Sequence, residues 1–541
     1  MGITITSTDK NNLVKLNSAL ANKLDIYYLT DSSLRFGFKI KDVTIKIDDQ
    51  LEDHQIILSK NVSNALNLPT ECEYELIVNN SELVIGPFIG IYAGQKKDTL
   101  IKKIRLMRGF IEEYNQFNGI VFVFCFNTIN KSKLTCSGFY YDPKNDRWVY
   151  STLPLPSMLF KRGLMSTTQR EYLGSLYGDK FFNYKAFGKW EMYNRMKRFQ
   201  EVKPYLPLTE SYKNANQLLE LLEQYNDIYV KPIGGKGGKG VFNIQKTQDG
   251  KYKVRTTVDK VANEKIYKHT SELTDFIKSN FEEDQFIIQQ TIDVKSDGKV
   301  FDFRVGYDKG LDGKWNRIMF ITRVGGENSV VSNFRAGGNL LEPEDALKQF
   351  YGLNERQIEE YRKNIFEAGD LIINALEKTS KHFGKAALDL IVDKHGKIWL
   401  IEVNIRHPDD TLRNFIEDER STFRKIRLTN MQYSKYLAGF SEKLNPIPTK
   451  FEDQPMEDKN TYAYKIYFYG KVQGVGFRKT LKHIGNDEEI TVKPTNLKNK
   501  NIVRVEFEGN HSQLESFISR AKQENKKANV NSISIMKIEE V

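Results

Sequence analysis

A glycine-rich segment toward the C-terminal end of the sequence has the residues needed to hold a phosphate group. Gly470, Gly474 and Gly476 separate a β-favouring run from a helical pattern that begins near Phe477. Glycines at such a turn let successive backbone N–H groups face one side, and the start of a helix adds partial positive charge. Arg478 can donate two parallel N–H hydrogen bonds to the same phosphate. The segment therefore predicts an anion site suited to phosphate chemistry.

The elements around this loop must hold it between a strand and a helix. Hydrophobic patterning over residues 461–541 predicts the order β, α, β, β, α, β, which is the ferredoxin-like α+β arrangement. The predicted elements cover Ala463–Tyr469, Phe477–Ile484, Ile490–Val492, Ile502–Glu508, Ser512–Lys522 and Ile533–Glu539.

The segment Gly470–Arg478 resembles the signature of the acylphosphatase family, and the resemblance covers residues 461–541. It implies that Arg478 is catalytic and that Asn496 orients the attacking water. Pro494-Thr495 departs from the residues that the family usually has before its Asn, and the turn after Asn496 is slightly longer than usual. An acyl phosphate already has a good leaving group, so charge stabilisation and a placed nucleophile suffice for its hydrolysis. The implied phosphate cradle consists of the amides of Gln473, Gly474, Val475, Gly476 and Phe477.

A second glycine-rich segment runs from Lys231 to Gly240 in the middle of the chain. It satisfies the spacing GxGxxG, but a P-loop requires Ser or Thr after the lysine, and Gly240 stands there instead. A dinucleotide-binding turn should open a helix, whereas the following Val241–Gln245 has the pattern of a strand. Protein kinases share such a loop, but the sequence contains neither His-Arg-Asp nor Asp-Phe-Gly. We therefore expect a hairpin over phosphates, with Lys231 on its first strand as a phosphate ligand.

Two acidic residues further along the chain are placed to share a magnesium ion. The strand-like runs around Asp389 and Glu402 are joined by the turn Asp393–Gly396, so antiparallel pairing would set the two carboxylates side by side. Together with Asn404 they offer hard oxygen ligands, which suit Mg²⁺ that bridges nucleotide phosphates. Carboxylates at a strand end can also simply face water. However, Glu402 and Asn404 share one face of an otherwise apolar strand, which favours the metal site.

Residues 86–413 resemble the ATP-grasp superfamily, in the branch found in spore-coat-associated proteins. Further segments that carry the resemblance are Pro154–Pro156, Lys189–Glu191, Tyr205–Thr209, Asp302–Arg304 and Ser332–Gly338. The resemblance implies ATP and Mg²⁺ as cofactors, with phosphorylation of a carboxylate followed by attack of an amine. Where relatives usually place a Pro-Gly turn, this sequence has Ile405–Asp410, which leaves the acceptor open.

The resemblance also implies a role for individual residues of this site. Arg304 would stabilise the transferring γ-phosphoryl group, and Lys189 and Lys231 would hold phosphates. The segment from Gln289 to Ile292 would line the adenine and ribose. The full implied ATP-binding set is Lys189, Lys231, Gly235, Gly237, Gly238, Gly240, Gln289, Gln290 and Ile292, and the implied metal ligands are Asp389, Glu402 and Asn404.

The chain of 541 residues exceeds what one hydrophobic core usually organises, so we expect an α/β and α+β multidomain protein. An ATP-grasp fold with a preceding α/β domain would be followed by the ferredoxin-like acylphosphatase domain. The expected boundaries are 1–85 for a small β-rich domain, 86–185 for the α/β domain, 186–440 for the ATP-grasp domain, 441–460 for a proline-containing linker and 461–541 for the acylphosphatase-like domain.

The amino-acid composition limits the classes of partner and the cellular compartment that we expect for the protein. Lys and Arg number 81 against 70 Asp and Glu, a net charge of +11 that fits either a general lysine bias or anionic ligands. No long basic run or basic-aromatic repeat predicts nucleic-acid binding. Three cysteines without metal-ligand spacing fit free thiols in a reducing compartment. Neither a signal peptide nor an apolar run long enough to span a membrane is visible, so we expect a cytoplasmic protein.

Two functions are consistent with these features. The first is a bifunctional enzyme with an acylphosphatase and a carboxylate-amine ligase of the ATP-grasp type. Its partners would be small-molecule or peptide carboxylates and amines, and acyl phosphates. The alternative is a spore-coat or scaffold-type ATP-binding protein in which only the acylphosphatase domain is catalytic.

Overall fold

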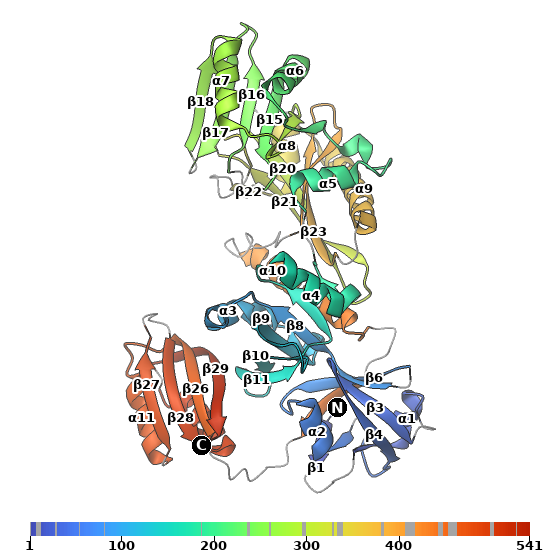
Figure 1. The fold of residues 1–541 in the computed structure, drawn as a ribbon, viewed down its shortest axis with the longest axis vertical. Coiled ribbons are helices and arrows are strands. Elements are labelled where there is room, and N and C mark those ends of the chain that lie inside the picture. Colours follow the sequence, from blue (N-terminus) through green and yellow to red (C-terminus); the bar gives the residue numbers. More distant parts are fainter. Residues whose placement is uncertain are drawn as a thin grey trace. The chain divides into compact units, whose positions relative to one another are not determined.

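The structure is a computed structural model, and two compact units make up the chain (Figure 1). Unit 1 comprises residues 1–182, 310–313 and 427–541, and unit 2 comprises residues 183–309 and 314–426. The described residues are 2–6, 12–26, 30–53, 55–80, 82–184, 187–234, 239–258, 261–294, 299–326, 329–332, 339–379, 383–405, 417–441, 447–452, 462–488, 490–497, 502–525 and 527–540.

The N-terminal part of unit 1 is a closed barrel whose strands come from two distant parts of the chain. β25 (Ile447–Glu452) pairs in parallel with β1 (Gly2–Thr6) and antiparallel with β6 (Glu73–Asn79). The expected linker 441–460 therefore needs correction, because part of it is a barrel strand, built from β-favouring residues such as Ile447 and Phe451. The other barrel strands are β2 (Leu13–Leu16), β3 (Asp31–Phe36), β4 (Lys39–Ile47), β5 (Ile56–Ser59) and β7 (Glu82–Gly86), and its helices are α1 (Ser18–Lys23) and α2 (Lys60–Leu66).

The rest of unit 1 is organised by one ten-stranded sheet that joins the expected α/β and acylphosphatase-like regions. The junction is the parallel pair of β11 (Arg147–Pro154) and β29 (Asn529–Glu540), with Trp148 opposite Ser534. The complete strand order is β13 (Phe181–Phe182), β12 (Met158–Lys161), β8 (Phe88–Tyr92), β9 (Ile120–Asn130), β10 (Thr135–Asp142), β11, β29, β26 (Tyr462–Lys471), β28 (Ile502–Gly509) and β27 (Thr491–Asn496).

The C-terminal strands of this sheet have apolar side chains on both faces. On one face, Ile466, Phe468 and Val505 form a core with α11 (Phe477–Asp487) and α12 (His511–Gln523). On the other face, Tyr467 and Tyr469 belong to the core of the α/β region, which includes α3 (Leu100–Met107). Burial on both faces accounts for the continuous apolar run Ile466–Tyr469 in β26. The sheet's other flanking helix is α4 (Thr167–Tyr177).

Unit 2 contains two antiparallel sheets with helices packed against them. The six-stranded sheet has the order β14 (Thr209–Ser211), β19 (Phe286–Gln290), β15 (Asp227–Pro232), β16 (Phe242–Lys246), β17 (Tyr252–Val258) and β18 (Val261–Tyr267), with α6 (Ala215–Tyr225) and α7 (Thr270–Asn280). The five-stranded sheet has the order β22 (Asn339–Leu341), β21 (Trp315–Val324), β20 (Phe301–Lys309), β23 (Lys385–Val392) and β24 (Ile398–Asn404), with α5 (Lys189–Met196), α8 (Pro343–Tyr351) and α9 (Glu355–Thr379).

The helices of unit 2 follow from amphipathic sequence patterns and local capping. The side chain of Asn214 accepts a hydrogen bond from the backbone N–H of Gln217 at the start of α6, and Asn226 ends the helix in the left-handed conformation. Leu218 and Leu222, one turn apart, are fully buried. The remaining long helix, α10 (Glu417–Leu437), crosses the point in the sequence where the two units divide.

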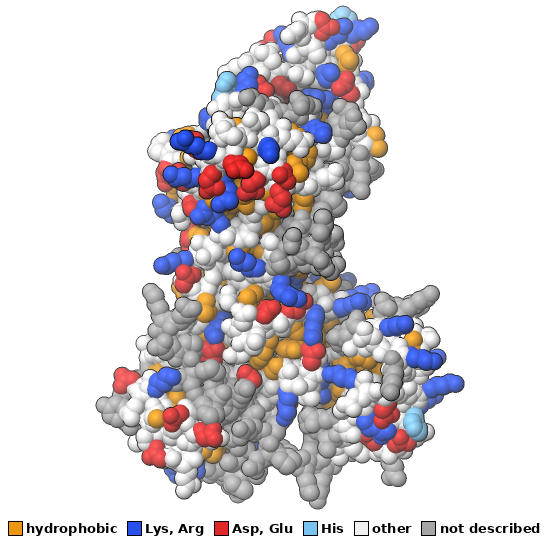
Figure 2. Space-filling model, turned by 180° about the vertical axis from the view of Figure 1, so that it is seen from behind, with side chains coloured by type: hydrophobic (Ala, Val, Ile, Leu, Met, Phe, Trp, Pro, Cys, Tyr) orange, Lys and Arg blue, Asp and Glu red, His pale blue; other side chains and the backbone are white. Residues whose placement is uncertain are grey.

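On the face drawn in Figure 2, Asp and Glu gather in one group in the upper part of the view with Lys and Arg around it. Elsewhere on this face, charges of both signs are scattered. No helix in the described part of the chain has the length and apolarity needed to cross a membrane.

Candidate functional site

The glycine-rich loop of unit 1 lies between β26 and α11, as the sequence predicts. Gly474 and Gly476 have φ angles of +76° and +77°, and Gly476 is the N-cap of α11. Side chains are disfavoured in this left-handed conformation, so the loop requires glycine at both positions. Among the described residues, none accepts a hydrogen bond from the backbone N–H groups of Gly474 to Phe477. These amides and the helix start can therefore bind an anion.

The strand register places Asn496 on the face of the sheet that carries α11. Asn496 pairs with Val503, and Val503 is buried in the core beneath α11 and α12. Directly paired residues of antiparallel strands project to the same face, so Asn496 projects to the helix side. The preceding Thr495 pairs with Arg504 and projects to the opposite side. Arg478 is exposed in the first turn of α11. Arg478 and Asn496, the two residues implied in catalysis, therefore lie on the same side of the sheet.

The side chain of Gln473 ties the cradle to the strand end that carries Asn496. Its Nε2 donates to the carbonyl of Leu497 at 2.9 Å and to that of Ile502 at 2.7 Å. Leu497 directly follows Asn496. Sequence reasoning gave Gln473 only a backbone amide, whereas its side chain fixes the distance between the loop and the end of β27.

In unit 2 the glycine-rich segment joins two antiparallel strands. Val230 of β15 pairs with Phe242 of β16, which confirms the predicted hairpin. Gly240 follows the turn with a φ of +71°. Gly235, Gly237 and Gly238 lie outside the described residues. The six-stranded sheet therefore supplies both strands of the expected phosphate-covering hairpin.

Lys231 is held by a buried glutamine. Its Nζ donates to Oε1 of Gln289 at 2.5 Å, and Nε2 of Gln289 donates to Thr209 at 2.9 Å. Burial lowers the pKa of Lys231 to about 8, although the nearby carboxylate of Glu402 acts in the opposite direction. A phosphate next to this ammonium would favour its charged form.

Of the other expected nucleotide-binding residues, Lys189 lies close to Glu402, whereas Gln290 and Ile292 lie at or just after the end of β19. Lys189 begins α5, and its Nζ lies 3.7 Å from Oε1 of Glu402. Gln290 accepts a hydrogen bond from the backbone N–H of Leu208 at 3.0 Å. Ile292 is partly buried just after β19. Lys189, Lys231 and Glu402 thus form a local group of charges, while the side chain of Gln290 secures a neighbouring loop.

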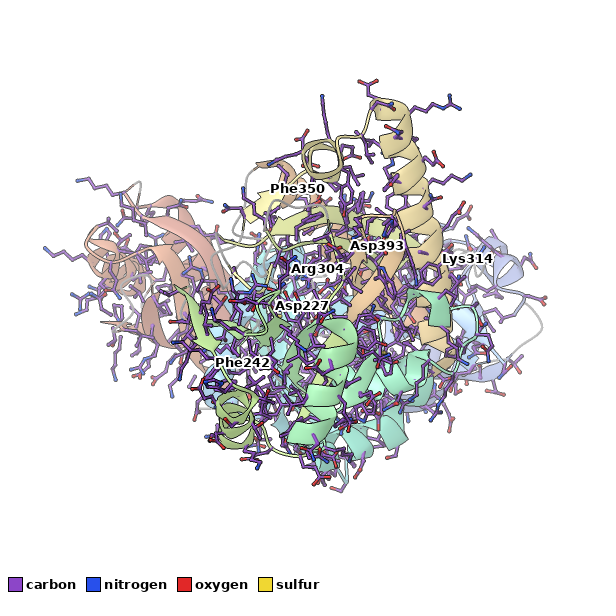
Figure 3. The ribbon with its side chains drawn as sticks, turned by 90° about the horizontal axis from the view of Figure 1, so that it is seen from above. Asp227, Phe242, Arg304, Lys314, Phe350 and Asp393 are labelled. Carbon is purple, nitrogen blue, oxygen red and sulfur yellow. The ribbon has the colours of Figure 1, made fainter. Side chains whose placement is uncertain are left out.

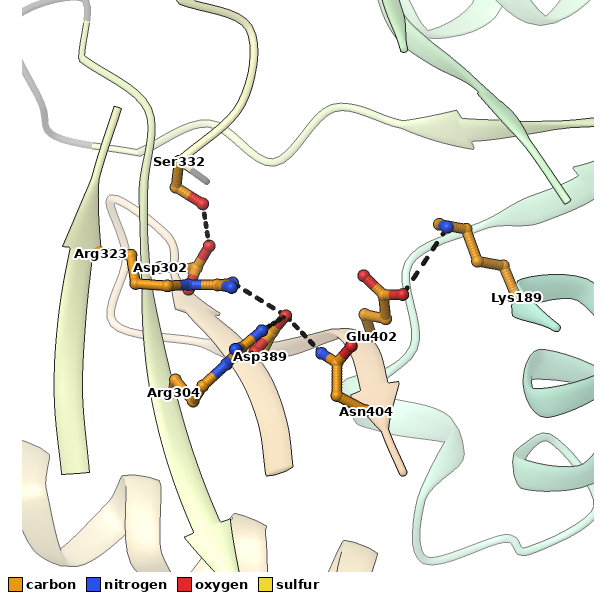
Figure 4. Close-up of polar contacts among 8 residues, drawn as sticks. All are labelled: Lys189, Asp302, Arg304, Arg323, Ser332, Asp389, Glu402 and Asn404. Atoms are coloured by element: carbon orange, nitrogen blue, oxygen red, sulfur yellow. Dashed lines mark hydrogen bonds and ion pairs between the residues drawn. The ribbon is translucent and has the colours of Figure 1, made fainter. Parts of the chain in front are cut away.

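Asp389 lies opposite Glu402 in the pair of β23 and β24, so the predicted side-by-side placement is confirmed. Figure 4 shows that Asp389 faces two arginines. Arg304 donates to both of its oxygens, from Nε at 2.8 Å and Nη2 at 2.9 Å, and Arg323 Nη2 lies 2.8 Å from Oδ2. Nδ2 of Asn404 also donates to Oδ2 at 2.8 Å. Burial alone would raise the pKa of Asp389, but the two guanidinium groups hold it below its ordinary value.

Arg323 and Asp302 extend this network and were not identified as site residues from the sequence. Arg323 pairs with Asp302 across β21 and β20, and its Nε donates to Oδ1 at 2.8 Å. Ser332 donates its hydroxyl to the other carboxylate oxygen of Asp302. A charged residue within the apolar run Ile318–Val324 was the available sequence signal. Figure 3 marks Arg304 on β20, while Asp227, also marked, belongs to β15 of the other sheet of this unit.

The donor chemistry of this face fits a magnesium ion only in part. Both oxygens of Asp389 already accept hydrogen bonds from arginine, and no described cluster of three or more His, Cys, Asp or Glu side chains is arranged for a metal. Glu402 is about one third exposed, at 37%, and Asn404, two residues further along β24, offers an amide oxygen. Magnesium commonly takes one or two protein oxygens and completes its shell with phosphates and water. Glu402 and Asn404 fit that pattern better than Asp389 does.

Comparisons with known proteins match separate parts of the chain. The family described as "YheC/D like ATP-grasp" matches residues 178–437, and the acylphosphatase family matches residues 464–541. The endospore coat-associated protein YheD of Bacillus subtilis (strain 168) is 24% identical over 393 residues, which are 69% of this chain and 83% of that protein. The endospore coat-associated protein YheC of the same organism is 20% identical over 316 residues, 56% of this chain and 85% of that protein.

Two solved structures are among those that match parts of the chain. An acylphosphatase from Bacillus subtilis is 26% identical, with a TM-score of 0.14 over 15% of this chain and 87% of that chain. D-alanyl-alanine synthetase A from Vibrio cholerae O1 biovar eltor str. N16961 is 11% identical, with a TM-score of 0.37 over 64% of this chain and 99% of that chain.

Proposed function

We propose a two-activity enzyme, on the premise that the chain joins a YheC/D-like ATP-grasp domain at residues 178–437 to an acylphosphatase domain at residues 464–541. The C-terminal domain would hydrolyse acyl phosphates to a carboxylate and inorganic phosphate. The ATP-grasp domain would use ATP to join a carboxylate to an amine. The observation that carries the first activity is the cradle of available amides beside Arg478, which Gln473 ties to the strand end of Asn496.

In the acylphosphatase reaction, the amides of Gly474 to Phe477 hold the phosphoryl oxygens and Arg478 neutralises their charge. Asn496 orients a water molecule for in-line attack. The water oxygen forms the new bond to phosphorus, the bond to the acyl oxygen breaks, and the carboxylate leaves with the electron pair. The site contributes positioning and charge stabilisation, which are the effects that this reaction requires.

The acylphosphatase proposal is tested by steady-state hydrolysis of benzoyl phosphate. Removing one principal oxyanion-stabilising group typically lowers kcat by about 10²–10³-fold, so Arg478→Ala should show a loss of that size. Lys482→Ala on α11 provides the matched control, since this exposed cation lies about one turn beyond Arg478. Equal activity of the wild-type chain and Arg478→Ala would exclude the proposed site.

In the ligase reaction, Lys189 and Lys231 hold the phosphates of ATP and Arg304 stabilises the transferring γ-phosphoryl group. A carboxylate oxygen of the substrate attacks the γ-phosphorus, ADP leaves, and an amine then displaces phosphate from the acyl carbon. Glu402 and Asn404 would hold Mg²⁺, which supplies neutralisation of phosphate charge when bound. Support comes from the grouping of Lys189, Lys231 and Glu402.

The two activities share one chemical species, because the ligase makes an acyl phosphate and the second domain destroys one. We propose that the acylphosphatase site removes acyl phosphates that find no amine. With ATP and a carboxylate but no amine, the wild-type chain should then release inorganic phosphate faster than Arg478→Ala. Equal release, in enzymes that both form ADP, would contradict this coupling.

A second candidate function is an ATP-binding scaffold in which only the acylphosphatase domain turns over. It is favoured by the engagement of both Asp389 oxygens with arginine, which leaves fewer ligands for a metal. The names of YheD and YheC also associate those relatives with the endospore coat. ATP binding without ADP formation across panels of carboxylates and amines would support the scaffold. ADP formation that requires both substrates would support the ligase.

A further inference from the structure

The C-terminal end of α12 contacts the phosphate cradle through Asn525, which lies two residues beyond the helix. Nδ2 of Asn525 donates to the carbonyl of Val475 at 3.2 Å and to Oγ1 of Thr480 at 3.0 Å. Its Oδ1 accepts from the backbone N–H groups of Lys527 and Ala528, both at 3.1 Å. The amide group is therefore fixed on both sides. It connects the segment after α12 to the loop and to the first turns of α11.

The carbonyl that Asn525 holds belongs to a peptide bond of the cradle. In a trans peptide, the carbonyl of one residue and the N–H of the next point in opposite directions. Fixing the carbonyl of Val475 toward Asn525 therefore directs the N–H of Gly476 away from Asn525. The flanking Gly474 and Gly476 have left-handed φ angles and little intrinsic preference for one orientation of this peptide. A hydrogen bond from outside the loop can therefore determine the orientation of the Val475–Gly476 peptide.

The same end of α12 is also anchored to the α/β region of unit 1. Nζ of Lys522 donates to the carbonyl of Asn145 at 2.8 Å. The turn that presents this carbonyl is rigid, because buried Asp142 accepts from Nε of Arg147 at 2.7 Å and from Nδ2 of Asn145 at 3.1 Å. Partial burial lowers the pKa of Lys522, and the nearby carboxylate of Asp146 acts in the opposite direction. The helix end thus lies between a fixed turn and the cradle.

We propose that the end of α12 is a positioning element for the acylphosphatase site, with Asn525 orienting the Val475–Gly476 peptide and Lys522 anchoring the helix end to the α/β region. The inference rests on the proposed acylphosphatase function. It adds that the phosphate affinity of the cradle depends on a part of the chain outside residues 464–541. Asn525 and Lys522 contact no reacting atom in this scheme and act through the Gly476 amide.

The test uses the full chain and two readouts, steady-state hydrolysis of benzoyl phosphate and binding of inorganic phosphate by calorimetry. Asn525→Ala should raise both KM and the phosphate Kd about tenfold, as expected for weakening one hydrogen bond to a charged group. The change in kcat should be smaller, because the Gly476 amide binds ground state and transition state alike. Asn525→Asp keeps the shape of the side chain but replaces the Nδ2 donor with an acceptor that faces the carbonyl of Val475, so it should bind phosphate no better than Asn525→Ala.

Lys522→Ala tests the anchor, and its expected effect is an increase in KM and phosphate Kd of about threefold, the weaker end of the range for a single hydrogen bond. Gln523→Ala is the matched control, because this neighbouring side chain is exposed and, within the described part of the chain, its one hydrogen bond goes to Ser519 of the same helix. It should leave both constants unchanged. The thermal midpoint of each variant shows whether it is folded.

The outcomes separate this inference from the proposed function. Unchanged KM and phosphate Kd in folded Asn525→Ala, or in Lys522→Ala, would overturn the positioning role. If Asn525→Ala does not fold, the KM and phosphate Kd of Lys522→Ala decide whether the positioning role stands. A wild-type chain that binds phosphate without hydrolysing benzoyl phosphate would refute the proposed activity, while the phosphate affinities would still test the positioning element.

Discussion

Arg323 and Asp302 face each other across β21 and β20, with Nε to Oδ1 at 2.8 Å and both side chains at most 10% exposed. Arg323 also reaches Asp389, so one guanidinium group joins two buried carboxylates. Buried charges are destabilising unless each is paired. Burial raises the pKa of the Asp302 carboxyl, and the guanidinium of Arg323 acts in the opposite direction. The pair is therefore a structural support for the face that carries Asp389.

Removing Arg323 should strongly destabilise unit 2. Arg323→Ala leaves two carboxylates without a shared partner, and loss of one member of a buried pair typically costs about 3–5 kcal/mol. Arg317→Ala, on the same strand but 43% exposed and 3.7 Å from Asp370, should cost about 0–1 kcal/mol. Thermal and denaturant unfolding followed by circular dichroism would measure both. Similar losses for the two variants would contradict the assigned role of Arg323.

The low pKa of Lys231 predicts pH-dependent binding of ATP. Above the free-state pKa of about 8, Lys231 must take up a proton when phosphates bind, so the Kd for ATP should rise up to about tenfold per pH unit between pH 8 and 9. Lys231→Arg remains charged and should bind with little pH dependence in this range. Calorimetric titrations at several pH values provide the measurement. An equally steep dependence in Lys231→Arg would assign the titration to another group.

The same shift predicts the pH dependence of stability without nucleotide. A lysine with a lowered folded-state pKa binds fewer protons in the folded than in the unfolded state above pH 8. Stability from this group should therefore rise as pH increases from about 8 toward the ordinary lysine pKa. Lys231→Met, which cannot titrate, should lack this increment when its unfolding midpoints are compared with those of the wild-type chain.

The bridging side chain of Gln473 predicts a catalytic defect rather than a binding defect alone. Gln473→Leu keeps the backbone amide of the cradle but removes the hydrogen bonds to Leu497 and Ile502. Asn496 would then be less well placed, so kcat for benzoyl phosphate should fall about tenfold or more, given the sensitivity of in-line attack to position. A normal kcat in a folded variant would show that the bridge is dispensable.

The two carboxylates of the expected metal site should behave differently when neutralised. Glu402→Gln should weaken Mg²⁺-dependent binding of ATP while leaving the unfolding midpoint close to that of the wild-type chain, because this residue is partly exposed. Asp389→Asn should lower the midpoint, because buried Arg304 loses its anionic partner and Arg323 keeps only Asp302. Calorimetry with and without Mg²⁺ and thermal unfolding separate the two effects. Identical responses would argue that both residues hold the metal.

Local features of the fold followed well from the sequence. The resemblances to the ATP-grasp and acylphosphatase families are confirmed by the family matches at 178–437 and 464–541. The mixed α/β fold class is confirmed, as is the pairing of Asp389 with Glu402. Such features depend on residues that are close in the sequence. The spacing of apolar residues indicates individual helices and strands, and a short turn sets the register of the two strands that it joins.

The features that escaped prediction involve partners far apart in the sequence. β25 pairs with β1 and β6, which lie hundreds of positions earlier in the chain. The residues of β25 alone do not indicate which strands they pair with. The joining of β11 to β29 is of the same kind. Arg323 was missed because its partner Asp302 is recognisable only once β20 and β21 are aligned. Apart from the linker, the domain boundaries stay predictions, as do the roles of the site residues.

The parallel pairing of β11 with β29 also has a consequence for how the chain is synthesised. Both β25 and β29 follow unit 2 in the chain, so the barrel and the ten-stranded sheet reach their full strand content only after residues 183–426 have been translated. Until then β11 presents an open edge, which is a surface prone to pairing with other chains. Unit 2 can complete its own sheets first. A ribosome-bound intermediate would thus hold a complete unit 2 and an incomplete unit 1.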